Sequence, residues 1–413
     1  MALVPLSYYA LLEVFIFLAV AELLHSFTSK VGLPNLVSDV LLGILLSGFA
    51  LGGILNALFG APIFVVNDYL LLFADFSVIL LLFAAGLAGG FAGLRSAGVG
   101  ALAAALAGDL VPFLAVFALF SQFYSLSVAL LLGVAASGTS SAVVASLLQS
   151  EDLRGSDPGH FMMNVSALDD VVALLFLSVA LTIVGGQAGV LAVTGGVLEL
   201  VAAWIILLLA AVLILPRLLR IRRLRETRGM PFLFLFVIIV IVVSLGFSAI
   251  IGAYIAGIAI AESLVASRTR ELTEVLLLLF GSLFFVVTGA QFDFHILFQP
   301  DVVVLALVLA GIAALGKFAG VYPLARRRFD PATARTVALG TVPLGEIGLI
   351  VGAIGITSGV LSQTQLGEIL LMSLLTTLVA SFLFRRGARR IRPAPSGSPV
   401  GALVSAADSG VGK

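Results

Sequence analysis

Two aspartates stand side by side in a stretch of the chain that is apolar enough to lie within a lipid bilayer. Asp169 and Asp170 occur in the sequence NVSALDDVVALLFLSVALTIVGG. A carboxylate in the middle of a membrane is costly, so an adjacent pair predicts a hydrated cavity, a cationic partner or a bound ion. The chemistry open to such a pair is the binding and release of cations and protons.

One basic residue is a candidate partner for these acids. Of the 22 Lys and Arg residues, only Lys317 lies in the interior of an apolar segment, ALVLAGIAALGKFAGVYPLA. Its ammonium group could extend to the membrane surface, but the residue lies deep enough for pairing with a buried aspartate to be the preferred interpretation. Two buried acids and one buried base are typical of a protein that moves protons, ions or both.

The composition is that of a membrane protein with many spans. Of the 413 residues, 61% are hydrophobic, 11% are charged and none is cysteine. A soluble fold could not bury so much apolar surface. The absence of cysteine excludes disulfides and thiolate chemistry, and the formal net charge of zero gives no indication of nucleic-acid binding. The N-terminal residues lack the pattern of a removable signal peptide.

Charged and turn-rich interruptions divide the chain into about thirteen segments of membrane-spanning length. Lys and Arg fall in alternate connections, so the positive-inside rule predicts an outside N-terminus and a cytoplasmic C-terminus. The Arg-rich segment 217–228 is then a cytoplasmic anchor near anionic lipid. The predicted segments are 8–27, 35–55, 69–89, 97–120, 126–149, 162–184, 189–215, 231–246, 249–264, 272–290, 302–324, 333–358 and 366–384.

Two of these segments are interrupted by residues that break helices. Segment 126–149 contains the hydroxyl-rich run SGTSS, with Thr139 and Ser140 at its centre, and segment 333–358 contains Pro343, Gly345 and Glu346. Small residues or one proline alone would be ordinary packing features. Two breaks at matching depths, together with buried charges, indicate a transporter site between inverted repeats.

Several polar residues are candidates to support this site. Ser166 lies one helical turn before Asp170, and Asn164 lies within two turns. The Glu346 carboxylate follows the second break, where it would offset the positive N-terminal dipole of the next half-helix. For the remaining intramembrane acids the sequence leaves three roles open, namely capping a break, lining a cavity or lying near an interface: Asp39, Asp75 and Asp109. Glu262 ends its segment and is expected to be solvated.

At these residues and the motifs around them, the chain resembles the cation/proton antiporter superfamily, and specifically its bacterial NapA-type sodium/proton branch. The similarity runs in order over about residues 8–385. It is carried by LPNLVSDVLLGILLSG, DFSVILLLFAAGL, SGTSSAVV, SALDDVVAL, FSAIIGAYIAGIAIAES, GSLFFVVTGAQFDF, LGKFAGVYPLARR and TVPLGEIGLIV. No single fragment is specific, but the ordered set is.

The resemblance implies an all-α fold of about 13 transmembrane helices with two broken crossing helices. It implies one transmembrane domain, 1–385, followed by a disordered cytoplasmic tail, 386–413. Within the domain it implies core helices at about 97–184 and 302–384. It also implies dimerisation helices at about 8–89 and 231–290, and a linker helix at about 189–215. The expected protein is a homodimer in the inner (plasma) membrane.

The resemblance also implies the roles of individual residues. Asp170 would bind either the transported cation or protons, and Asp169 would pair with Lys317. Thr139 and Ser140 would mark the first unwound stretch and Glu346 the second. Two positions depart from the family pattern: Leu344 stands where the P-x-G-E motif often has arginine, and Asp109 stands in a core helix that usually has small or apolar residues there.

The expected function is therefore electrogenic exchange of Na⁺ or Li⁺, with K⁺ left open, for protons by alternating access, without a cofactor. Three other functions are considered. A sodium-coupled organic anion symporter would need a larger basic cavity. An intramembrane aspartyl protease would need aspartates on different helices, and an ion channel would show a filter-like repeat. The enzyme interpretation is rejected, because the two aspartates are adjacent.

Overall fold

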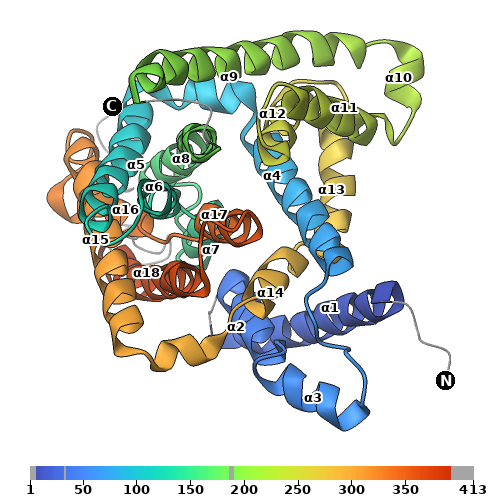
Figure 1. Ribbon diagram of the computed structural model, residues 1–413. Coiled ribbons are helices and arrows are strands. Elements are labelled where there is room, and N and C mark those ends of the chain that lie inside the picture. Colours follow the sequence, from blue (N-terminus) through green and yellow to red (C-terminus); the bar gives the residue numbers. More distant parts are fainter. Residues whose placement is uncertain (1–5, 32–33, 186–189, 392–413) are drawn as a thin grey trace, which may run out of the picture.

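The computed structural model is helical apart from one isolated β-bridge, and it describes residues 6–31, 34–185 and 190–391. Its helices lie in two groups, with one long helix beside both (Figure 1). The first group packs α4 against α12 and α2 against α14. Its helices are α1 (Leu6–Val31), α2 (Asn35–Leu46), α3 (Leu51–Phe59), α4 (Asp68–Ser96), α11 (Met230–Ser244), α12 (Ala249–Ala261), α13 (Ala266–Phe280) and α14 (Leu283–Ala290).

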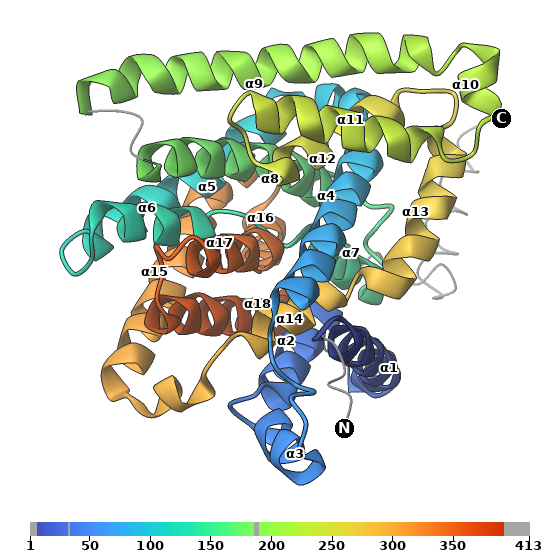
Figure 2. The same cartoon turned by 45° about the vertical axis from the view of Figure 1, so that its right-hand side comes forward.

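The second group packs α5 against α15 and α18 against both α15 and α16. The long helix α9 (Val190–Leu218) contacts α8 in this group and α12 in the first, and it crosses over both in Figure 2. The short α10 (Arg222–Glu226) follows it, and a 3₁₀ helix, η1 (Phe294–Phe298), leads from α14 to α15. The helices of the second group are α5 (Gly98–Phe120), α6 (Leu126–Ala135), α7 (Ser141–Ser150), α8 (Asp157–Val184), α15 (Pro300–Ala325), α16 (Pro331–Gly340), α17 (Glu346–Thr357) and α18 (Gln363–Ile391).

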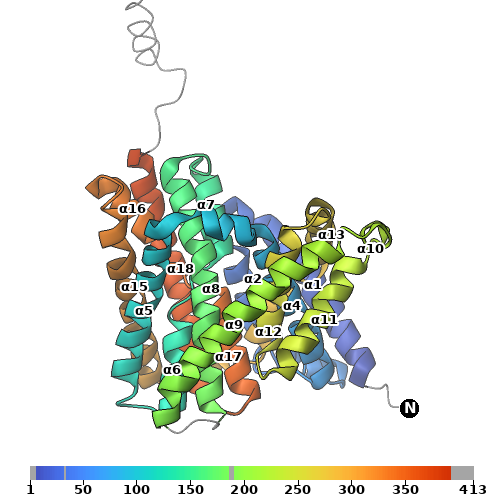
Figure 3. The same cartoon turned by 90° about the horizontal axis from the view of Figure 1, so that it is seen from above.

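The helices match a polytopic membrane protein. Eight described spans are long and apolar enough to cross a bilayer, or nine when the bent pair α2–α3 is counted as one. Each of the thirteen predicted segments corresponds to a helix or a helix pair. The pairs α6–α7 and α16–α17 are the two predicted broken helices, and their halves run to opposite faces of the molecule (Figure 3).

Three further departures from straight helices were not predicted. The segment predicted at 35–55 is bent by 42° between α2 and α3. The segment predicted at 272–290 is divided between α13 and α14. Helix α4 extends to Ser96 but has non-helical backbone at Gly90, where φ is 61°, a conformation that glycine adopts without steric cost.

The break in α4 is capped by two charged side chains from the neighbouring helices. Arg270 donates to the carbonyl of Leu87 from Nε at 3.2 Å and from Nη2 at 3.0 Å. The amide of Ala92 donates to Glu262 Oε1 at 2.8 Å. These contacts satisfy backbone groups that the break leaves free. Glu262 follows the end of α12 and is exposed, as predicted, and it also caps this break.

Two predicted boundaries also change. Helix α8 begins at Asp157 rather than at residue 162, because the Ser156 side chain accepts from the amide of Gly159 and caps it. Helix α18 continues to Ile391, so the predicted tail cannot begin at residue 386. The rest of that tail, residues 392–413, lies outside the described part of the chain.

Helices α5 and α15 approach each other closely at two glycines of α15. A Cβ atom built on Gly320 would lie 2.3 Å from the carbonyl oxygen of Ala107, and one built on Gly316 would lie 2.8 Å from Cα of Pro112. Only a residue without a side chain fits at such distances. This close packing places the middle of α15, including Lys317, against the middle of α5.

Candidate ion-binding site

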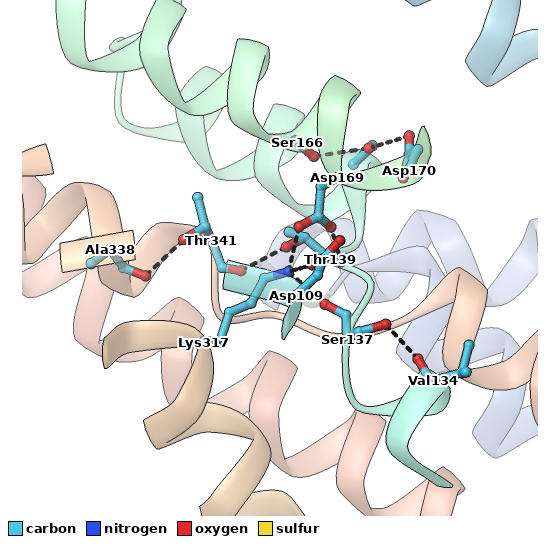
Figure 4. Close-up of polar contacts among 11 residues, drawn as sticks. Asp109, Val134, Ser137, Thr139, Ser166, Asp169, Asp170, Lys317, Ala338 and Thr341 are labelled. Atoms are coloured by element: carbon cyan, nitrogen blue, oxygen red, sulfur yellow. Dashed lines mark hydrogen bonds and ion pairs between the residues drawn. The ribbon is translucent and has the colours of Figure 1, made fainter. Parts of the chain in front are cut away.

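The two broken helices meet at the centre of the second group. The backbone amide of Ser140 donates to the carbonyl of Pro343 at 2.8 Å, and Thr139 and Leu344 form the isolated antiparallel bridge. The Thr139 hydroxyl group donates to the carbonyl of Thr341 at 2.9 Å (Figure 4). The breaks free these backbone groups from helical hydrogen bonds, and each stretch uses the other to satisfy them.

Lys317 lies beside this crossing with no solvent exposure. Its Nζ atom donates to Asp169 Oδ1, to Asp109 Oδ1 at 2.5 Å and to the carbonyl of Ser137 at 2.5 Å (Figure 4). An ammonium group has three donors, so all three are used. The structure thus places Lys317 against Asp169, the partner that the resemblance implied, and also against Asp109, whose role the sequence had left open.

Asp169 also joins the lysine to the first broken helix. Its Oδ2 atom accepts a hydrogen bond from the backbone amide of Thr139. Asp169 thus bridges the Lys317 ammonium group and the unwound stretch of the first broken helix. Asp169 lies within a buried polar cluster and has no exposed surface.

Asp170 has different surroundings, in keeping with the angle of about 100° between adjacent helical residues. Its Oδ2 atom accepts from the Ser141 hydroxyl group at 2.9 Å, and Ser141 lies 2.8 Å from Ser166 Oγ. The residue is 8% exposed. A carboxylate with hydroxyl groups around it is a suitable set of oxygen ligands for a hard monovalent cation.

Ser141 is a residue of this site that was not predicted from the sequence. It belongs to the SGTSS run, but it begins α7 instead of lying in the unwound stretch. The predicted Ser166 reaches Asp170 only through Ser141. The side chain of Asn164 is partly exposed and forms no hydrogen bond with either aspartate in the described part of the chain. The distance from Ser141 to α8 is a tertiary feature that spacing along the chain could not reveal.

Glu346 lies between the first turns of two half-helices. It is the first residue of α17, and its Oε1 atom accepts from the amide of Ala142, in the first turn of α7, at 3.4 Å. A carboxylate there interacts favourably with the positive ends of both half-helices. Leu344, which stands where arginine is often found, is fully buried, and its carbonyl accepts from the Thr377 hydroxyl group at 3.1 Å.

A cavity of about 520 Å³ leads to Glu346 from the face at which α7 ends. Glu22, His25 and Asp39 line it, and His25 Nε2 lies 2.6 Å from Asp39 Oδ1. Ala142, the neighbour of Ser141, also lines it. Towards the opposite face, beside Asp75 and the last turns of α17, there is a cavity of only about 40 Å³. Of these two cavities, the one on the α7 side is the wider.

Unwound helices crossing within a helical bundle, with buried carboxylates and a lysine at the crossing, define a secondary transporter. Residues 14–387 match the model of the family described as "Sodium/hydrogen exchanger, transmembrane", and the chain belongs to this family. The family lies within the cation/proton antiporter superfamily, so the resemblance at that level is confirmed.

Two curated relatives illustrate the similarity. The Na⁺/H⁺ antiporter of Enterococcus hirae is 25% identical over 370 residues, which cover 88% of this chain and 94% of the relative. The Na⁺/H⁺-K⁺ antiporter GerN of Bacillus cereus is 25% identical over 374 residues, covering 89% and 93%.

A solved structure extends the similarity to the fold. The sodium proton antiporter MjNhaP1 of Methanocaldococcus jannaschii superposes with a TM-score of 0.71 at 14% identity, covering 92% of this chain and 96% of that one. The predicted fold class is confirmed by this likeness.

Proposed function

We propose that this protein exchanges a monovalent cation, Na⁺ or Li⁺ with K⁺ also open, for protons across the membrane. Asp170 is the residue that binds the cation or a proton. The observation that carries this proposal is the separation of the two adjacent aspartates: Lys317 engages Asp169, whereas Asp170 accepts a hydrogen bond from the Ser141 hydroxyl group. Asp170 is thus the carboxylate free to change its partner.

Coupling follows from competition at one carboxylate. A proton and a metal cation cannot occupy Asp170 together, so each must leave before the other binds. If the site is exposed to one side of the membrane at a time, the two fluxes must run in opposite directions. The exchange needs no cofactor, because the transmembrane ion gradients supply the free energy.

Alternating exposure requires one helix group to move against the other. We assign the moving core to α5–α8 and α15–α18, the dimerisation scaffold to α1–α4 and α11–α14, and the link between them to α9. The long crossing of α9 over both groups supports this division. The scaffold is proposed to form the contact of a homodimer.

The proposed location is the plasma membrane, with the N-terminus outside and the C-terminus in the cytoplasm. The Arg-rich segment after α9, Arg95 and Arg154 then all face the cytoplasm, as the positive-inside rule requires. In this orientation the cavity of about 520 Å³ opens to the cytoplasm. Exchange is proposed to move more than one proton per cation, so the rate should depend on membrane potential.

Proton flux in proteoliposomes tests the function directly. Na⁺, Li⁺ and K⁺ are added separately to vesicles with an imposed pH gradient, for the wild type and for Asp170→Asn. Collapse of the gradient by Na⁺ or Li⁺ in the wild type only would support the proposal. Response to K⁺ alone would make potassium the substrate. No response to any cation, or uptake of an organic anion with Na⁺, would contradict it.

A further inference from the structure

Asp109 is a buried carboxylate that the exchange cycle described above does not use. It lies in the middle of α5 with no exposed surface, and its Oδ1 atom is 2.5 Å from Lys317 Nζ. Its Oδ2 atom is buried without a hydrogen-bond partner among the described residues. A second carboxylate beside an already paired lysine is unusual, because burying an additional charge without a matching counter-charge is energetically unfavourable.

The two carboxylates reach the lysine from helices that are held differently. Asp109 comes from α5, whose tight contact with α15 fixes it beside Lys317. Asp169 comes from α8, where it is the neighbour of the cation-binding Asp170. Asp109 is therefore the fixed partner of the lysine, and Asp169 is the partner whose position is tied to the transport site.

This difference matters when a cation binds. A cation next to Asp170 attracts Asp169 as a second carboxylate ligand and weakens its contact with Lys317. If Asp169 were the sole counter-ion, the buried ammonium group would be left unpaired, and a buried unpaired charge is neutralised by loss of its proton. With Asp109 in place, Lys317 keeps an ionic partner.

We propose that Asp109 is a second counter-ion of Lys317, which keeps the ammonium group paired and protonated when Asp169 turns from the lysine to the transported cation. The charged groups that face Asp109 are Lys317 from α15 and Asp169 from α8, with Asp170 next along α8. Protons are then exchanged on the carboxylates, and the lysine remains a fixed charge. This inference rests on the proposed cation exchange.

Thermal unfolding of the purified full-length protein tests the pairing without any transport assay. The variants are Asp109→Asn, Asp169→Asn and the double variant. Each single variant leaves the lysine with one carboxylate, whereas the double variant leaves none. We expect the fall in Tm of the double variant to exceed the sum of the two single falls. The proposal would be overturned if the fall in Tm of the double variant equalled the sum of the two single falls, or equalled the fall of Asp169→Asn alone.

If the double variant is too unstable to purify, a triple variant covers that case. Adding Lys317→Gln removes the unpaired ammonium group, so the triple variant is expected to fold where the double does not. Failure of the triple variant to fold would show that the loss of the carboxylates themselves, and not an unpaired lysine, disrupts the protein, which would overturn the proposal.

Exchange kinetics separate this role from simple packing. In Asp109→Asn, binding a cation must break the last ion pair of Lys317, so we expect KM for Na⁺ to rise about tenfold, with a smaller change in maximal rate. Asp109→Glu, which keeps the charge, should restore most of the affinity. Asp68→Asn, an exposed residue at the start of α4 and outside the cluster, is the control and should leave KM unchanged.

The outcomes distinguish the two proposals. An unchanged KM in Asp109→Asn, or an equal rise in Asp109→Glu, would contradict the role of Asp109 alone. Absence of exchange by the wild type would contradict the proposed function, whatever the unfolding experiments show.

Discussion

The functional difference between two chemically identical neighbours comes from the groups around them. Asp169 contacts an ammonium group and a backbone amide, whereas Asp170 accepts from the hydroxyl group of Ser141. Ionic partners hold a carboxylate in one place more strongly than a single hydroxyl group does. In this conformation Asp169 is consequently held by Lys317, whereas Asp170 is available to bind an ion.

The hydroxyl group of Ser141 gives a prediction at this scale. In Ser141→Ala, Asp170 loses its hydrogen bond and the cation loses a nearby oxygen, so KM for Na⁺ should rise about fivefold, equivalent to about 1 kcal/mol. Ser178→Ala is the control, because that hydroxyl group donates to Leu174 of its own helix at 2.7 Å. KM for Na⁺ can be measured from the dequenching of a pH-sensitive fluorescent dye when Na⁺ is added to acid-loaded vesicles. Equal KM values for both variants would refute the role of Ser141.

At the scale of elements, the site depends on how closely α5 and α15 pack. Lys317 and Asp109 meet because glycines at positions 316 and 320 allow one helix to lie against the backbone of the other. The crossing of the broken helices is likewise made by backbone groups of α6–α7 and α16–α17. The positions of the charged side chains are thus set by contacts between whole helices.

A pair of glycine substitutions in α15 tests this packing. In Gly320→Ala the new methyl group would meet the Ala107 carbonyl at 2.3 Å, so we expect destabilisation by about 1–3 kcal/mol and a lower Tm. Gly311→Ala is the matched control, because a Cβ there has nothing within 4 Å and alanine favours the helix by up to about 1 kcal/mol. Equal Tm values for the two variants would show that the close contact is not needed.

At the scale of the whole molecule, the two faces differ in access. The cavity of about 520 Å³ approaches Glu346 from the end of α7, whereas the cavity beside Asp75 and α17 holds only about 40 Å³. Because the chain contains no cysteine, single cysteines can report this asymmetry without background labelling.

Labelling with a membrane-impermeant thiol reagent should follow the cavity. Ser146→Cys, in the larger cavity, is expected to react readily in inside-out vesicles and not in right-side-out vesicles. Ala353→Cys, beside the smaller cavity, should react slowly from either side. Fast labelling of Ser146→Cys from outside would reverse the proposed orientation, and equally fast labelling of both variants would contradict the difference in access.

Sequence alone determined the membrane fold, the thirteen helical segments and the two breaks. Long apolar runs and Pro343 act through local rules that do not depend on distant contacts. It also singled out Asp169, Asp170 and Lys317, since charges in apolar segments are rare. The bend between α2 and α3 was not predicted. The break at Gly90 escaped prediction because the backbone groups it frees in α4 are satisfied by Glu262 and Arg270, which lie far along the chain.

Only the tertiary structure decided which charges meet. Asp109 and Lys317 are 208 residues apart in the chain and Asp169 and Lys317 are 148 apart, so no spacing rule relates them. The same is true of Ser141 and Asp170. Helical geometry makes adjacent side chains point about 100° apart, but the packing of α5, α7, α8 and α15 decided that one aspartate faces a lysine and the other a hydroxyl group.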